Sequence, residues 1–190
     1  MIKKHAPVVI FTKKTMKKKV TLAMLFSFVG ICAFAQTIVS TSPENRKVIL
    51  EEFTGLNCVN CPQGHAIAQN IQNNNQGDVF LINIHAGGYA NPTGPGTDFR
   101  TSFGSAIDGQ SGLAGYPAGT VNRHNFPGLE QGSAGATAMG RANWATAATQ
   151  TLTEPSPVNV ATQASVDLSS GIITVDVEVY FTGTQTVSSN

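Results

Sequence analysis

The stretch that decides the fold is Glu51-Glu52-Phe53-Thr54-Gly55-Leu56-Asn57-Cys58-Val59-Asn60-Cys61-Pro62, a strand-like apolar run followed by a turn and two cysteines three positions apart. A helix that begins at such a pair holds one thiol near the positive end of the helix dipole, which favours the thiolate. The second thiol is then close enough to resolve a mixed disulfide. Pro62 suits the first turn of that helix, where its missing N–H costs no hydrogen bond. The stretch therefore predicts a strand, a turn and a helix that starts with a dithiol or a disulfide.

Apolar periodicity extends this unit along the chain. Residues 47–53 read as a buried strand, and apolar positions at helical spacing predict a helix over residues 58–75. The near-continuous apolar run at residues 79–84 predicts a strand buried on both faces of a sheet. Strand, helix and strand of these lengths make a βαβ unit.

The next segment contains weaker signals. Residues 85–97 are rich in glycine and proline and predict a loop over the end of the sheet. A short helix is expected at residues 98–107 with Asp98 near its start, and a weak strand at 118–122 after Tyr116-Pro117. The alanine-rich residues 133–150 predict a closing helix despite three glycines, with Trp144 in the core.

Beyond a proline-containing linker at residues 151–157, the apolar period changes to two. Alternate residues from Val158 to Leu168 share one face, Ser169-Ser170-Gly171 makes a turn, and alternate residues from Ile173 to Phe181 share a face on the return. This pattern predicts a hairpin with one apolar side. Because two strands cannot cover such a side and an Ig-like sandwich needs about 100 residues, we expect the start of a sandwich whose remaining strands are missing.

The N-terminus has the order of a signal peptide. Lys17, Lys18 and Lys19 precede the apolar run 20–34, which closes on small residues before Gln36, so we expect cleavage after Ala35. Met16 is an alternative start. Cys32 lies in the removed segment and lacks the small preceding residue of a lipoprotein box.

Removal of this segment changes the charge of the chain. Seven of the twelve basic residues precede Gln36 and none of the eleven acidic ones do, so the mature chain has five basic and eleven acidic residues and a formal charge of −6. This negative charge argues against nucleic-acid binding and against attachment to membranes through a polybasic segment. Cys58 and Cys61 are the two remaining cysteines, and an oxidising compartment suits a disulfide or an exchanging dithiol.

The order of the expected elements resembles the thioredoxin fold. In that family a cis proline precedes the third core strand and faces the disulfide, and Pro117 matches that position. The resemblance implies that Cys58 is the exposed nucleophile, that Cys61 is the buried resolving thiol and that Pro117 holds a substrate strand beside the sulfurs. The chain departs from the ordinary pattern because Val59 and Asn60 stand where well-known thioredoxins have Gly-Pro, and no tryptophan precedes Cys58.

A closer resemblance is to the Omp28-related outer-membrane proteins of Bacteroidota, and it spans residues 47–125. The matching motifs are Glu51-Glu52-Phe53-Thr54-Gly55, Cys58-Val59-Asn60-Cys61-Pro62, Ile84-His85-Ala86-Gly87 and Gly115-Tyr116-Pro117-Ala118-Gly119-Thr120-Val121-Asn122-Arg123. This resemblance implies an outer-membrane, surface or periplasmic location and a thioredoxin-like domain followed by a β-sandwich. The expected organisation is a signal peptide (1–35), a leader (36–45), a thioredoxin-like α/β domain (46–150), a linker (151–157) and the beginning of an Ig-like sandwich (158–190).

Two alternatives to an exchanging pair stay open. A static disulfide is one, although a loop of about four residues removes only roughly 2 kcal/mol of unfolded-state entropy. Metal binding by Cys58, Cys61 and His65 is the other, because the three could face one ion, with His85 at the adjacent strand end. No fourth ligand is evident, and His65 and His85 are also explained as packed residues.

The other chemistry-bearing residues carry weaker signals. Asp98 and Arg123 could pair across a loop or bind a ligand, although solvated charges are the simpler interpretation, and His124 is expected in a loop. The loop at Gly87–Gly96 lacks a phosphate-binding pattern.

Two function classes follow from the sequence. The first is an exported thiol–disulfide exchange protein that acts on other envelope or extracellular proteins, with no cofactor. The second is a surface adhesion or ligand-binding module with an inert disulfide.

Overall fold

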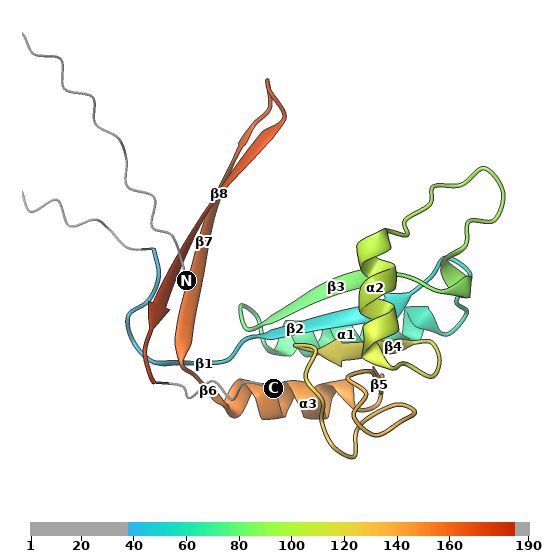
Figure 1. Cartoon of the computed structure of the whole chain (residues 1–190), viewed down its shortest axis with the longest axis horizontal. Coiled ribbons are helices and arrows are strands. Elements are labelled where there is room, and N and C mark those ends of the chain that lie inside the picture. Colours follow the sequence, from blue (N-terminus) through green and yellow to red (C-terminus); the bar gives the residue numbers. More distant parts are fainter. Residues whose placement is uncertain (1–37, 185–190) are drawn as a thin grey trace, which may run out of the picture. The chain divides into compact units, whose positions relative to one another are not determined.

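The computed structural model describes residues 38–184 and has a mixed α/β architecture with three α-helices and several sheets (Figure 1). The expected signal peptide at residues 1–35, with its cleavage site, Met16 and Cys32, lies outside the described residues.

A four-stranded sheet forms the centre of the fold. Its strands are β2 (Val48–Thr54), β3 (Val79–His85), β4 (Ala118–Val121) and β5 (Met139–Gly140), in the order β3-β2-β4-β5. β2 and β3 are parallel and are joined by helix α1 (Cys61–Asn74), so the βαβ unit is confirmed. β4 runs antiparallel to β2 and places Thr120 opposite Glu51.

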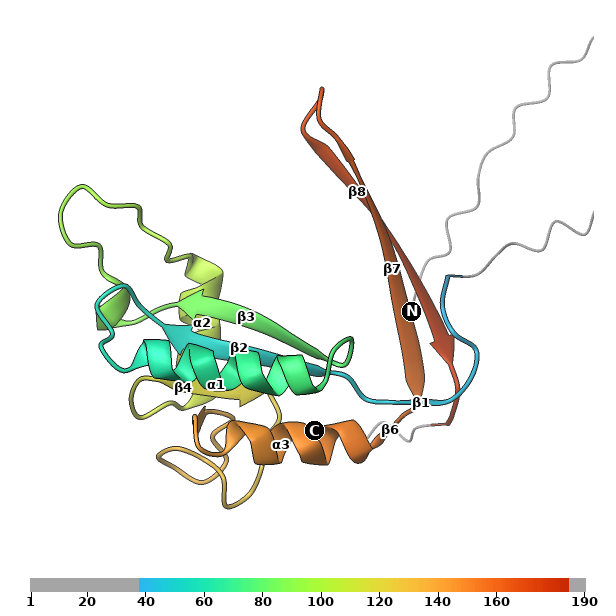
Figure 2. The same ribbon diagram turned by 180° about the vertical axis from the view of Figure 1, so that it is seen from behind.

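Helices cover both faces of this sheet (Figures 1 and 2). On one face, α1 and α3 (Trp144–Thr153) pack against Val48 and Leu50 in the larger apolar core. On the other face, α2 (Ser102–Ser111) packs near Phe53 through Ile107 in a smaller core. Successive side chains of β2 therefore alternate between two differently covered faces.

The prediction that residues 79–84 are buried on both faces is wrong. Phe80 and Ile82 of β3 are 49% and 45% exposed. Among the described residues β3 pairs only with β2 and is the edge strand of the sheet, and α2 covers only part of the face to which these side chains point.

All three helices begin later than the sequence predicts, and the difference is largest for α2 and α3. The hydroxyl of Thr101 accepts a hydrogen bond from Gly104 N and starts α2 at Ser102, so Asp98 lies outside the helix. Residues 133–143 are not helical, since Gly135 has φ +89°, a left-handed conformation that a right-handed helix excludes, and Met139 pairs with β4. α3 then begins at Trp144, which is fully buried as predicted.

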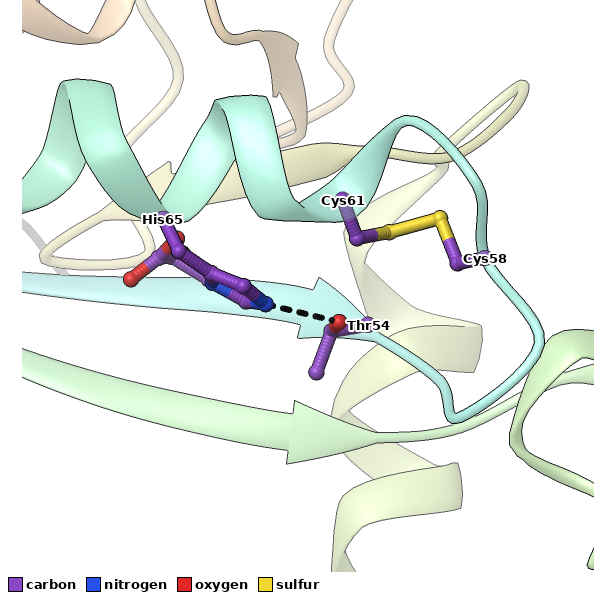
Figure 3. Close-up of a disulfide and its surroundings, with 5 residues drawn as sticks. Thr54, Cys58, Cys61 and His65 are labelled. Carbon is purple, nitrogen blue, oxygen red and sulfur yellow. Dashed lines mark hydrogen bonds and ion pairs between the residues drawn. A yellow bond between two sulfur atoms is a disulfide. The ribbon is translucent and has the colours of Figure 1, made fainter.

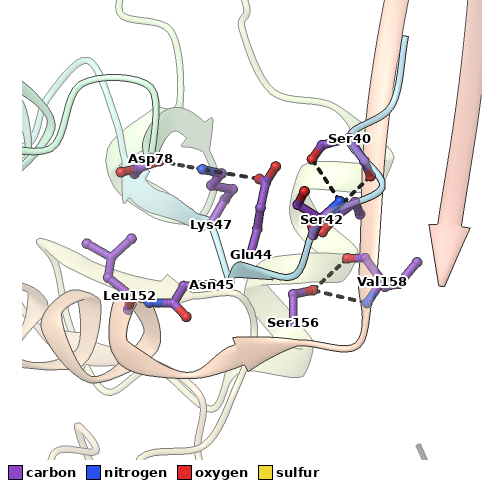
Figure 4. Close-up of polar contacts among 10 residues, drawn as sticks. Ser40, Ser42, Glu44, Asn45, Lys47, Asp78, Leu152, Ser156 and Val158 are labelled. Carbon is purple, nitrogen blue, oxygen red and sulfur yellow. Dashed lines mark hydrogen bonds and ion pairs between the residues drawn. The ribbon is translucent and has the colours of Figure 1, made fainter. Parts of the chain in front are cut away.

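The expected linker is partly ordered secondary structure. α3 continues to Thr153, and β6 (Pro155–Ser156) pairs with β1 (Glu44–Asn45), a two-residue strand within the expected leader. Figure 4 shows polar contacts around β1, including the ion pair of Lys47 with Asp78.

The hairpin is confirmed. β7 (Val158–Asp167) pairs antiparallel with β8 (Ile172–Phe181), and the register sets Val160 opposite Val179 and Val166 opposite Ile173. Within residues 38–184 these two strands form a sheet of their own, without further strands of the expected sandwich.

Candidate functional site

A disulfide between Cys58 and Cys61 stands at the beginning of α1 (Figure 3). Cys58 ends the loop that follows β2, Cys61 is the first residue of the helix, and their Cα atoms are 5.4 Å apart. The backbone N–H of Cys61 donates to the carbonyl of Cys58 at 3.3 Å, which closes the turn between them. The structure thus brings together the two cysteines that the sequence singles out.

The loop before Cys58 is packed tightly against the short 3-10 helix η1 (Gly88–Ala90). Asn57 N–H donates to the carbonyl of Tyr89 at 2.9 Å. A Cβ at Gly55 would lie only 2.3 Å from the backbone carbonyl carbon of Tyr89, so no larger residue fits at position 55 without moving one of the segments. This contact fixes the approach of the chain to the disulfide.

Pro117 lies against the first turns of the same helix, and the Tyr116–Pro117 peptide bond is cis. A Cβ at Gly64, one turn beyond Cys61, would lie 3.3 Å from Pro117 Cβ and 3.2 Å from Trp144. Glycine at position 64 therefore allows Pro117 to pack directly on α1. The third predicted site residue joins the cysteines at this end of the helix.

Both cysteines are largely shielded, which corrects the expectation of an exposed Cys58. Cys58 is 8% exposed and Cys61 2%. The larger exposed area still belongs to Cys58, and the neighbouring apolar side chains Leu56, Val59 and Tyr89 are open to solvent. Access to the pair is therefore easiest from the Cys58 side.

Sequence reasoning missed a polar cluster that lies on the same face of α1. His65 Nδ1 is 2.9 Å from Glu52 Oε2, and His65 Nε2 is 3.2 Å from Thr54 Oγ1 (Figure 3). His65 follows Cys61 by one helical turn. Glu52 and Thr54 are two positions apart and therefore lie on the same face of β2. Helix and strand periodicity together bring His65 into contact with both of these strand residues. The two acids in an otherwise apolar strand were the available signal.

The side chain of Glu52 is almost completely buried beneath α1. Burial raises the pKa of this carboxyl above its ordinary value, while the hydrogen bond from His65 acts in the opposite direction. Glu52 therefore keeps its proton to a higher pH than an exposed glutamate does.

The alternative metal site is not assembled. The sulfurs of Cys58 and Cys61 are joined to each other, and the Nδ1 atom of His65 faces Glu52. Within residues 38–184 no group of three or more histidine, cysteine, aspartate or glutamate side chains is arranged to hold a metal ion.

The opposite face of β2 contains a second ion pair. Arg123 donates from Nε to Glu51 Oε2 at 2.7 Å and from Nη2 to Oε1 at 2.5 Å. Asn122 and Arg123 have φ of 51° and 49°, a left-handed conformation that asparagine tolerates and arginine rarely adopts, and the Asn122 side chain accepts a hydrogen bond from Ile49 N–H beside this turn. The suggested pairing of Arg123 with Asp98 is therefore wrong, because Asp98 pairs with Arg100.

Tyr116, His85 and His124 make side-chain contacts near the disulfide and the two ion pairs. The hydroxyl of Tyr116 donates to Asp108 Oδ1 at 2.8 Å, and burial together with this bond raises the pKa of the phenol. His85 ends β3 as expected, with its ring 5.3 Å from that of Phe99. His124 lies in a loop and packs edge-on against Phe126.

The structure thus places Cys58, Cys61 and Pro117 at one end of α1 and adds Glu52 and His65 to them. No family model, no curated protein and no solved structure matches the chain.

Proposed function

We propose that the chain contains a thioredoxin-like domain that exchanges disulfides with other proteins through Cys58 and Cys61. The observation that carries the proposal is a disulfide at the N-terminus of α1 with Pro117 packed one turn away on Gly64. The order β2, α1, β3, then β4 antiparallel to β2 directly after Tyr116–Pro117, supports the thioredoxin-like assignment.

The exchange has two steps. A substrate thiolate attacks Sγ of Cys58, the Cys58–Cys61 bond breaks, and Cys61 leaves as a thiolate. A second substrate thiolate then attacks the substrate sulfur of the mixed disulfide, and Cys58 leaves as a thiolate. The substrate dithiol loses two electrons and the protein gains them, and the reverse sequence reduces a substrate disulfide. Attack at Cys58 is favoured because it is the less shielded cysteine.

The buried carboxyl of Glu52, whose pKa is raised, supplies a proton for this chemistry. Glu52 contacts His65, which lies one helical turn from Cys61. A proton from Glu52 can pass to the Cys61 thiolate when that thiolate is released and return when the disulfide forms again.

An inert disulfide is the second candidate, and the low exposure of both sulfur-bearing residues favours it. In that case the domain is a binding module for envelope or extracellular proteins. Against this candidate stands the short loop that the disulfide closes, which removes only roughly 2 kcal/mol of unfolded-state entropy.

Export is part of the proposal. It is supported by the basic and apolar order of residues 17–35, and the described part of the chain has no helix long and apolar enough to cross a membrane. We further propose an outer-membrane, surface or periplasmic location, and that β7 and β8 are strands of an Ig-like sandwich. Mass spectrometry of the secreted protein is expected to find Gln36 at the N-terminus, whereas retained Met16 contradicts cleavage.

Redox titration tests the exchange reaction. The purified protein is equilibrated in glutathione buffers, and free thiols are alkylated and counted by mass. As the buffer is made more reducing, an exchanging pair is expected to be reduced before the potential falls to about −300 mV. A pair that is still oxidised below about −300 mV, in a protein that does not reduce insulin, contradicts the proposal.

Two matched variants test the roles of the cysteines. Cys61→Ser is expected to accumulate mixed disulfides with substrate proteins, because the resolving thiol is gone. Cys58→Ser is expected to accumulate far fewer, since the shielded Cys61 is harder to attack. Equal trapping by the two variants contradicts the assigned order of attack.

A further inference from the structure

Two neighbouring pockets lie between the sheet and α2, on the face opposite the α1 helix and its Glu52–His65 pair, and because they share two wall residues we treat them as two lobes of one cleft. The smaller lobe has a volume of ≈ 170 Å³ and the larger ≈ 360 Å³, and Ile107 and Arg123 border both. The larger lobe has the size of small-molecule sites, which begin at about 300 Å³.

Unpartnered polar atoms border this cleft. Within residues 38–184, two buried side-chain polar atoms have no hydrogen-bond partner, Thr120 Oγ1 and His85 Nδ1. Thr120 is fully buried and borders the smaller lobe, whereas His85 borders the larger one. Because buried polar groups are normally paired, two such atoms beside one cleft each lack a partner that the described residues do not supply.

The larger lobe has a mostly apolar wall. Ile82 and Ile84 come from β3, Phe103 and Ile107 from α2, and Phe99 from the preceding loop. Phe99 and Phe103 are more than half exposed, which is costly for aromatic side chains unless something covers them. This lobe therefore suits an aliphatic or aromatic body.

The charge of the cleft decides which polar head fits. The guanidinium of Arg123 is neutralised by the bidentate bond to Glu51, while its Nη1 makes no hydrogen bond to the described residues. An anionic head would meet the Glu51 carboxylate and a cationic head the Arg123 guanidinium. An uncharged head that accepts from Nη1 and pairs with the Thr120 hydroxyl avoids both repulsions.

We propose that this cleft binds a small uncharged amphipathic molecule, with its apolar body between β3 and α2 and a carboxamide or hydroxyl head at Thr120 and Arg123. This site is separate from the cysteines and does not depend on the exchange reaction.

The test uses 2-phenylacetamide as a probe for the full ¹⁵N-labelled protein, with phenylacetate and toluene as controls that have a charged head and no head. Backbone amides of Ile107, Gln110 and Thr120 are expected to shift saturably with 2-phenylacetamide. Phenylacetate and toluene are expected to bind at least about tenfold more weakly, because one buries a charge beside Glu51 and the other leaves Thr120 unpaired. Absence of a saturable shift with 2-phenylacetamide overturns the proposal and leaves ordered water as the occupant.

Two buried threonines provide matched variants. Thr120→Val removes the unpartnered hydroxyl, so it is expected to leave the urea midpoint unchanged or raise it and to weaken probe binding about tenfold. Thr151→Val removes a hydroxyl that donates to Ala147 O at 3.0 Å on the opposite side of the sheet, so it is expected to lower the midpoint and leave binding unchanged.

Phe103→Ala, at an exposed position, is expected to weaken binding without unfolding the protein. Probe binding that survives both Thr120→Val and Phe103→Ala overturns the proposal.

Discussion

His65 and Glu52 join helix α1 to strand β2 through a 2.9 Å contact between Nδ1 and Oε2. The carboxyl is buried and the imidazole is 38% exposed, so one member of the pair meets solvent and the other does not. The disulfide begins one helical turn away on the same helix. A change in the charge of this pair is therefore expected to change the stability of the fold and the electrostatic environment of Cys61.

Glu52→Gln is expected to change how stability depends on pH. Because the pKa of Glu52 is raised in the folded protein, the folded state binds the proton more tightly than the unfolded state does. Wild-type stability therefore falls as pH rises from the ordinary glutamate pKa of about 4.3 through the raised folded value. Glutamine does not titrate, so the stability of the variant relative to wild type is expected to increase between pH 4 and pH 7.

Urea unfolding at several pH values, followed by the emission of Trp144, measures this difference. His65→Gln serves as the companion variant. It removes the imidazole that lowers the pKa of Glu52, so the total fall of stability is expected to be larger and to continue to higher pH than in the wild type. A difference between Glu52→Gln and wild type that is constant from pH 4 to pH 7 contradicts the assignment.

Gly55→Ala is expected to destabilise the fold. Its Cβ would collide with the backbone of Tyr89 and Ala90, and such overpacking typically costs about 1–3 kcal/mol. Gly109→Ala in α2 is the control, because a Cβ there meets no atom and alanine favours a helix by roughly 0.5–1 kcal/mol. Denaturant midpoints that are equal for Gly55→Ala and wild type would show that the loop before Cys58 is not fixed by this contact.

Arg123→Ala is expected to lower the free energy of unfolding by about 1–2 kcal/mol, because it leaves the buried carboxylate of Glu51 without its bidentate partner. The cost is smaller than for a fully buried pair, since the Arg123 side chain is 54% exposed and solvent screens the charge. Arg141→Ala is the control, as Arg141 makes no ion pair with the described residues, and is expected to stay within about 0.5 kcal/mol of wild type. A double-mutant cycle with Glu51→Ala measures the coupling, and a coupling energy near zero contradicts a stabilising pair.

The elements that the sequence predicted best are those for which a local pattern, such as the spacing of apolar residues or of cysteines, is sufficient to identify the element. Alternation of period two fixes the pairing of β7 with β8, and the cysteine spacing together with Pro62 places the start of α1 within three residues. These signals are local, so no knowledge of distant segments is needed.

The elements that it missed depend on neighbours from elsewhere in the chain. An apolar run such as residues 79–84 predicts a strand but does not reveal that β3 is an edge strand with half of one face uncovered. The Thr101 cap competes with Asp98 as a helix start, and composition alone does not decide between them. The Glu52–His65 and Glu51–Arg123 pairs join separate elements, and their partners become visible only when the sheet is assembled.

The hairpin supplies the last prediction. Val175, Val177 and Val179 are each more than half exposed and lie on one face of β8, opposite Ala164, Thr162 and Val160 of β7. Within residues 38–184 this apolar face is uncovered and the outer edges of β7 and β8 pair with no further strand, a combination that promotes association, so the chain is expected to self-associate as its concentration rises. Val177→Lys places a charge in the middle of this face and is expected to weaken association at least about tenfold, because burying an unpaired charge costs more than ~1.4 kcal/mol. Thr174→Lys puts the same charge on the other face of β8 and is expected to have little effect. Sedimentation velocity over a range of concentrations separates the two variants; a wild-type chain that stays monomeric throughout, or equal effects of the two lysines, would mean that this face does not drive association.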